Sequence, residues 1–144
     1  MAVNNEVDVA IQWIQGTLAG DTTLQGEAPG GVWRADAPAG TPGVYIAVTH
    51  QSNQGRDGTV FGGGRAFSEV FFEIVAAGPA TSAQTIASAA ARIDELLTVA
   101  QQTAITGGTL LGSFRMQPVE SDPLINGVVM TYNGGLYKLM VKAA

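Results

Sequence analysis

The sequence contains no cysteine and only one histidine, His50, among its 144 residues. Without cysteine the chain can form no disulfides and no thiolate metal sites. No apolar run approaches the roughly 20 residues of a membrane-spanning helix, and residues 1–8 lack the basic segment that opens a secretory signal. His50 ends an alternating strand pattern, which is typical of a packing or solvent-exposed residue rather than of a ligand or a base. We therefore expect no metal, no cofactor and no membrane segment.

Charged residues are also scarce, at 13% of the chain, and acidic residues outnumber basic ones by 12 to 7, which gives a formal net charge of -5. Tight binding to a phosphate backbone needs clustered lysine and arginine, so direct binding of nucleic acid is disfavoured. Two explanations of the low charge stay open. A glycine- and alanine-rich composition can simply provide uncharged polar surfaces. Alternatively, much of the surface meets other subunits, because interface cores are depleted of charge.

The motifs of common enzyme classes are missing as well. The sequence has no nucleophile elbow, no His-Glu-x-x-His zinc motif, no phosphate-binding Gly-Lys-Ser/Thr and no dinucleotide fingerprint. Glu69 and Glu73 fall on one face of a predicted strand, about 13 Å apart by strand rise. That separation exceeds the spacing of the paired carboxylates of glycosidases. We therefore predict that the protein is not an enzyme.

The stretch from residue 65 to 100 predicts a long strand, a break and a long helix. Alternation gives the strand at 65–77 one apolar face and one aromatic and acidic face: Val70, Phe72, Ile74 and Ala76 against Phe67, Glu69, Phe71, Glu73 and Val75. Gly78-Pro79 ends the strand, and Thr81 with Gln84 fits a capping box. Apolar residues then recur at helical spacing at Ile86, Ala90, Ile93 and Leu97. We expect this helix stripe and the apolar strand face to cover each other.

The remaining chain predicts shorter elements. A helix is expected over 6–19 and a loop over 21–31, and further strands over 32–35, 44–51, 109–116, 128–132 and 136–142. Asn133-Gly134 is a strong hairpin signal between the last two strands, although one long strand with a glycine bulge at Gly134-Gly135 fits the same residues.

The sequence thus predicts one α+β domain over residues 1–144. Its core would be a mainly antiparallel sheet of about four to six strands packed against two α-helices. The expected order is helix, three strands, helix, two strands.

Residues 53–64 connect two strands that we expect to pair as a hairpin. The segment is longer than most hairpin loops and contains five glycines. It is either a tolerated flexible insertion or an arm that orders only against a neighbour. Val60 and Phe61 favour the arm, because a purely solvated linker has little use for them, and Arg56 and Arg65 lie in or beside it.

The order of elements and several segments resemble the tail terminator (tail completion) proteins of long-tailed bacteriophages. The segments that carry the resemblance are Gly43-Val-Tyr-Ile-Ala-Val48, Phe67-Ser-Glu-Val-Phe-Phe-Glu-Ile-Val75, Ala90-Ala-Arg-Ile-Asp-Glu-Leu-Leu97 and residues 126–141. Related neck proteins, which join head and tail, share much of this pattern. The resemblance spans nearly the whole chain. It implies a small α+β subunit of a ring, usually a hexamer, that caps the finished tail tube and presents it to the head.

The resemblance implies a structural virion protein at the tail–neck junction, assembled in the host cytoplasm. Its partners would be copies of itself, the tail tube protein and a neck or head-completion protein, while DNA passes through a neutral or negative channel without specific binding. Two unpaired carboxylates would be costly to bury, so we expect the mixed strand face to meet a neighbour or the channel. The candidate interface or lumen residues are Arg56, Val60, Phe61, Arg65, Glu69 and Glu73. The alternatives are another neck component or a small ligand-binding or enzymatic α+β domain.

Overall fold

The computed structural model describes residues 6–35, 37–38, 41, 43–57 and 65–143, with the side chains of 53–57 and 65–66 outside the description. The elements follow in chain order: α1 (Glu6–Ala19), α2 (Thr22–Glu27), β1 (Val32–Arg34), β2 (Tyr45–Asp57), β3 (Arg65–Pro79), the 3-10 turn η1 (Ala80–Ser82), α3 (Ala83–Leu97), β4 (Thr103–Ile105), β5 (Gly108–Ser121), β6 (Leu124–Ile125) and β7 (Val128–Ala143).

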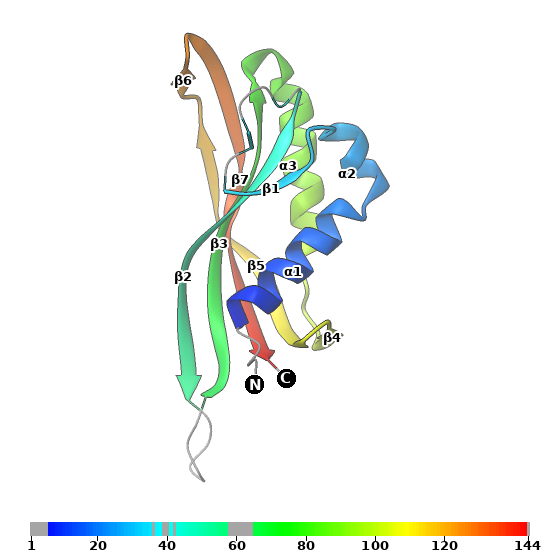
Figure 1. Ribbon diagram of the computed structural model, residues 1–144, viewed down its shortest axis with the longest axis vertical. Helices are drawn as coiled ribbons and strands as arrows, with labels where there is room; N and C mark the ends of the chain where they lie inside the picture. Colours follow the sequence, from blue (N-terminus) through cyan, green and yellow to red (C-terminus); the bar gives the residue numbers. More distant parts are fainter. Residues whose placement is uncertain (1–5, 36, 39–40, 42, 58–64, 144) are drawn as a thin grey trace.

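The strands form one mixed sheet in the order β1-β2-β3-β7-β5-β4, and β6 pairs with the beginning of β7 outside this path (Figure 1). β1 runs parallel to β2, and the other neighbouring strands are antiparallel. The predicted α+β class and mainly antiparallel sheet are confirmed. The described residues nevertheless form seven strands and three α-helices, where we expected about four to six strands and two helices.

The helices cover one face of the sheet, and the main hydrophobic core lies between them (Figure 1). The predicted contact between the stripe of α3 and the apolar face of β3 is confirmed, since both sets are buried: Ile86, Ala89, Ala90, Ile93 and Leu97 with Val70, Phe72, Ile74 and Ala76. Tyr137, Leu139 and Val141 of β7 extend this core. Each such large apolar side chain contributes about 1.5–3 kcal/mol through the removal of its surface from water.

The beginning of α3 differs from the prediction. β3 continues to Pro79, the 3-10 turn follows, and Ser82 at the N-cap makes no side-chain capping hydrogen bond. Instead, the backbone N–H of Ala83 donates to the carbonyl of Ala80. The turn thereby satisfies a backbone group that a capping side chain would otherwise serve, and the predicted capping box at Thr81 and Gln84 is wrong.

The predicted loop at 21–31 contains the short helix α2. Asp21 caps it by accepting a hydrogen bond from the backbone N–H of Leu24 at 3.0 Å. The same carboxylate receives two hydrogen bonds from Arg92 of α3, from Nε at 2.9 Å and Nη2 at 2.7 Å. Six residues carry too little periodicity to reveal a helix, and the arginine that fixes this one lies 71 positions further along the chain.

The predicted hairpin at Asn133-Gly134 is wrong, because β7 runs unbroken through these residues. The turn lies at the other Asn-Gly pair, Asn126-Gly127, where both residues have positive φ angles of 52° and 79°, as a two-residue hairpin loop requires. At Gly134 a Cβ atom would stand 2.0 Å from the carbonyl oxygen of Ile74, so only glycine allows β3 to approach this closely. The alternative of one long strand is confirmed, although the ladder irregularities lie in β5, between Leu110 and Gly112 and between Arg115 and Gln117, rather than at Gly134-Gly135.

The central strands are long and cross one another near the middle of an elongated molecule (Figure 1). β2 and β3 project toward one end, and β6 with the beginning of β7 projects toward the other. The helices lie on one side only, so the second face of the sheet and both projecting ribbons are left without a covering helix.

Candidate interaction surfaces

The described residues offer little for catalysis. No group of three or more His, Asp or Glu side chains among them could hold a metal ion, and none of the described helices is both long and apolar enough to cross a membrane. His50 is exposed on β2, and its ring centroid lies 5.4 Å from that of Phe72. The exposure and the ring contact agree with the prediction of a packing or solvent-exposed residue, although His50 does not end the strand, because β2 continues to Asp57.

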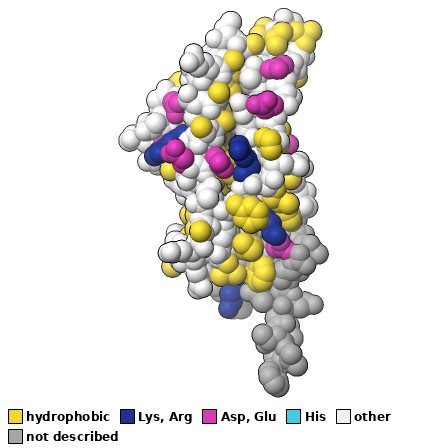
Figure 2. All heavy atoms as spheres, turned by 180° about the vertical axis from the view of Figure 1, so that it is seen from behind, with side chains coloured by type: hydrophobic (Ala, Val, Ile, Leu, Met, Phe, Trp, Pro, Cys, Tyr) yellow, Lys and Arg dark blue, Asp and Glu magenta, His cyan; other side chains and the backbone are white. Residues whose placement is uncertain are grey.

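The β6–β7 hairpin ends in what we call the apolar tip, formed by Leu124, Ile125, Val128 and Val129. Their exposed fractions run from 40% for Ile125 to 68% for Leu124, and Figure 2 shows hydrophobic side chains clustered at this end of the molecule. Leu124 pairs with Val129, and Ile125 with Val128, so each pair lies on one face of the ribbon. Both faces are therefore apolar, which is typical of a segment that docks on another protein. Sequence reasoning missed the tip, although Asn126-Gly127 between Leu-Ile and Val-Val was the available signal.

A groove of about 520 Å³ runs beneath the apolar tip. Ile125 and Val128 line one side of it, and Pro38, Tyr45 and Pro79 line the other. Deeper in the same region a small second core forms on the uncovered sheet face, from Tyr45, Ala47, Val75 and Ala77. The backbone N–H of Met130 donates to the carbonyl of Pro123 at 2.8 Å, which extends the β6–β7 pairing by one step. Met130 and Tyr132 pack against the small second core, so the beginning of β7 is anchored on the sheet next to the tip.

Further along the uncovered face lies an ion pair between Glu69 of β3 and Lys138 of β7. Glu69 is only 4% exposed, and the Lys138 ammonium lies 5.8 Å from the ring centroid of Phe114 on β5. The carboxylate therefore finds its cation within the same subunit. The cost of burying an unpaired carboxylate is therefore no longer a reason to place Glu69 at a subunit interface.

Of the other predicted interface or lumen residues, only Glu73 has a side chain that the structure describes. Glu73 is half-buried and lines a shallow hollow of about 320 Å³ with Thr49 and Tyr132. Arg56 and Arg65 belong to β2 and β3, and their side chains lie outside the described part, as do Val60 and Phe61 altogether. Residues 53–57 of the predicted arm continue β2 and pair with β3, while residues 58–64 lie outside the described part of the chain.

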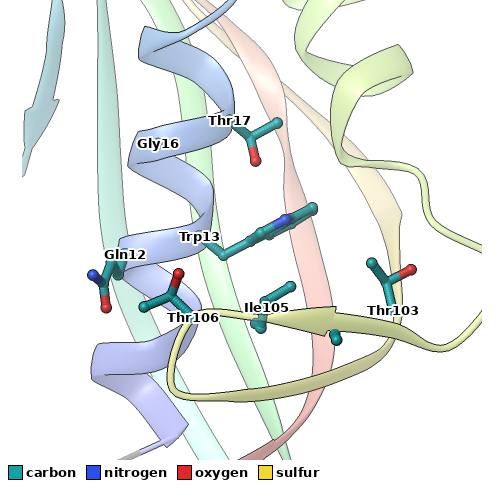
Figure 3. A pocket seen from close by; sticks show the side chains of 8 residues that line it. Gln12, Trp13, Gly16, Thr17, Thr103, Ile105 and Thr106 are labelled. Carbon is teal, nitrogen blue, oxygen red and sulfur yellow. The ribbon is translucent and has the colours of Figure 1, made fainter.

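A third surface lies between α1 and β4. A groove of about 610 Å³ is lined by Gln12, Trp13, Thr17 and Thr103–Thr106, and Figure 3 shows the indole of Trp13 extending from α1 over the strand that carries Ile105. Trp13 is half-buried and packs against the main core, in keeping with the rim position predicted for it. Its described lining is made of apolar, hydroxyl and amide side chains.

A polar cluster surrounds Asp94 of α3 on the helix-covered side. The Tyr137 hydroxyl donates to Asp94 Oδ1 at 3.2 Å, and Arg115 Nη2 lies 4.0 Å from Asp94 Oδ2. Burial raises the pKa of the Tyr137 hydroxyl, and the negative charge of Asp94 raises it further. Arg115 also passes over Gly135, where a Cβ atom would meet its Cδ at 2.3 Å. This arginine therefore serves the helix–sheet seam rather than the uncovered face.

Comparison with known proteins gives a fold relationship. No family model matches the chain, and no curated protein matches its sequence. A chain from a solved structure described as the virion of a native gene transfer agent particle has the same fold, with a TM-score of 0.66 and 19% sequence identity. The likeness covers 89% of this chain and 90% of that chain. At this identity it establishes a shared fold over nearly the full length of both chains, while membership of the tail terminator family stays a prediction.

Proposed function

We propose that this chain is a structural virion protein that assembles into a closed ring, a hexamer, at the junction of tail and neck. There it caps the finished tail tube and joins it to the head. The observation that carries the proposal is the fold shared with a virion chain over 89% of the sequence. The resemblance of the sequence to tail terminators supports the finer assignment.

The surface of the subunit supports an assembly role. Among the residues that the structure describes, seven large hydrophobic side chains are exposed, and they lie mainly on β5 and at the apolar tip. A monomer of this size has little reason to expose both faces of a hairpin as apolar surface. Burial of such surface in a ring or against a tail component would remove the cost of its exposure, and it would also account for the low proportion of charged residues.

The apolar tip is suited to contact another tail or neck protein along the long direction of the molecule. It lies at the end of a projecting ribbon, with Glu120 and Asp122 exposed nearby. In this proposal the tip contributes buried apolar area, and the acidic residues form a polar rim around it. DNA passes through the ring without specific contacts, since the net charge of -5 opposes retention of phosphates.

Native mass spectrometry of the purified protein tests the ring directly. We expect a species of six subunits, formed alone or on addition of tail tubes. A protein that stays monomeric or dimeric under both conditions would contradict the proposal and favour a small ligand-binding or enzymatic domain.

Particles made without this protein distinguish a terminator from another neck component. Loss of a terminator leaves tubes of uncontrolled length that do not join heads. If tubes instead keep their normal length and only the joining step fails, the chain is a different neck component.

A further inference from the structure

The sheet has two long stretches of edge that no described strand covers. β1 pairs with β2 only at Ile46–Val48, so from Thr49 to Asp57 β2 is paired on the β3 side alone. On the opposite side, β4 pairs with β5 at Gly108–Leu110, and Val99 bridges to Ser113. From Phe114 to Ser121, β5 is paired on the β7 side alone. Each stretch presents backbone N–H and C=O groups that can pair with another strand.

These two edges are complementary in direction. β2 is antiparallel to β3, β3 to β7, and β7 to β5, so β2 and β5 run in opposite directions on opposite sides of the sheet. When a second copy is placed beside the first in the same orientation, its β5 meets β2 in antiparallel fashion. The contact uses two different patches, so each subunit still has one free edge of each kind, and the arrangement can close into a ring.

The described side chains on these edges are mostly uncharged, with Arg115 the one charged residue in the segment 114–117. Natural edge strands that stay single usually carry lysine or an inward-pointing charge. Residues 49–52 of β2 are Thr-His-Gln-Ser, without charge. On β5, Phe114 is 42% and Met116 50% exposed, directly beside the free edge. Pro118 removes one backbone donor and interrupts the β5 edge, so the segment available for pairing is Phe114–Gln117, which includes the register shift between Arg115 and Gln117. The β2 segment that begins at Thr49 also contains a shift, between His50 and Ser52.

We propose that neighbouring copies of this chain join edge to edge, with the β5 segment Phe114–Gln117 of one copy adding antiparallel to the β2 segment that begins at Thr49 in the next. The inference rests on the proposed ring and names the contact that closes it. It makes the sheet continuous around the ring, with the helices of every subunit on the same side. Phe114 and Met116 become buried against the next subunit, where their apolar area stabilises the contact.

The lack of cysteine makes a crosslinking test clean. Adjacent strands bring paired Cα atoms within the distance a disulfide needs, so we would combine Met116→Cys with Thr49→Cys, Gln51→Cys or Ser52→Cys in one chain. Mild oxidation of the assembled protein should give a ladder of covalent species up to the full ring for at least one pair. The combination of Ser52→Cys with Val129→Cys at the apolar tip should give none.

Single cysteine variants and the native mass of the assembly distinguish a failure of the edge contact from a failure of the proposed ring. Covalent dimers from Met116→Cys alone would show that β5 pairs with itself, and they would overturn the proposal. A ring by native mass without any ladder would overturn the edge contact while the proposed function stands. Absence of a ring altogether would reject the proposed function, and the edge contact with it. As an independent measure, the double variant Phe114→Ser/Met116→Ser should raise the subunit concentration for half-assembly about tenfold or more, with an unchanged melting temperature for the isolated subunit.

Discussion

The two faces of the central sheet solve the problem of burial in different ways. The face under α1 and α3 is apolar throughout its centre, where Val70, Phe72 and Ile74 have no exposed surface. The uncovered face contains a buried carboxylate, Glu69, held by Lys138 and flanked by half-buried apolar residues. The comparison shows that apolar burial under the helices supplies most of the core of the fold. The residues of the uncovered face are held by contacts within the sheet, because none of the described helices packs on them.

The largest expected effect is on the helix-covered face. Ile93→Asp places a carboxylate at a position with no exposure, and the charge would find no partner between α3 and the sheet. We expect the variant to fail to fold, as judged by the loss of a cooperative melting transition. Ala91→Asp, on the exposed side of the same helix, is the matched control and should melt close to the parent protein. A folded Ile93→Asp protein would mean that α3 presents another face to the sheet.

A smaller loss is expected on the uncovered face. Lys138→Met removes the cation beside the buried Glu69 carboxylate, which should cost about 3 kcal/mol in the free energy of unfolding. The double variant Glu69→Leu/Lys138→Met should recover most of that loss, because a buried ion pair can be replaced by apolar residues of similar volume. Denaturant unfolding measures both. Lys142→Met, an exposed lysine further along β7, should change stability by less than about 0.5 kcal/mol, and an equal loss in both lysine variants would contradict the assignment.

Features set by neighbouring residues could be predicted from the sequence, whereas contacts between residues far apart in the sequence could not. The contact between α3 and β3 was predictable, because apolar residues recur with a period of two along the strand and of 3.6 along the helix. Both periods can be recognised within a short stretch of sequence. The partners of Asp21 and Glu69 were not, because Arg92 and Lys138 lie far along the chain. The sequence contains two Asn-Gly pairs with the same local signal. The close approach of β3 to Gly134 keeps one pair within a strand, and this is a tertiary constraint.

The contact between α2 and α3 lies within the helix layer and should make stability depend on pH, because it contains the ion pair between Asp21 and Arg92. Hydrogen bonds from Arg92 lower the pKa of the Asp21 carboxyl. The folded pKa is therefore below the unfolded value of about 3.9, so the stabilisation is complete above that value and disappears as the pH falls through the folded pKa. Asp21→Asn keeps a capping side chain but loses the ion pair. Its melting temperature should be lower than that of the parent protein at pH 7, and the two should converge in acid. A constant difference at all pH values would contradict this explanation.

The smallest effect on stability is expected at the apolar tip, which has no core on either side. Leu124→Asp should leave the melting temperature of the subunit unchanged, because this side chain is largely exposed already. It should nevertheless abolish binding to tail tubes or to the neck protein, measured by co-sedimentation. Thr85→Asp, which adds the same charge to the exposed side of α3, should bind normally. Normal binding by Leu124→Asp would remove the tip from the proposed interface.

The position of β7 in the sheet has a consequence for the order of folding. It is the last of the described strands in sequence, yet it lies between β3 and β5 and is the only strand that pairs with both within the described structure. During synthesis, the β2–β3 ribbon and β5 therefore remain separate until β7 has left the ribosome. These non-local pairings make for slow folding. They also mean that a nascent chain cannot display its two free edges on opposite sides of one sheet before β7 is in place, so subunits become competent to associate only after β7 has been synthesised.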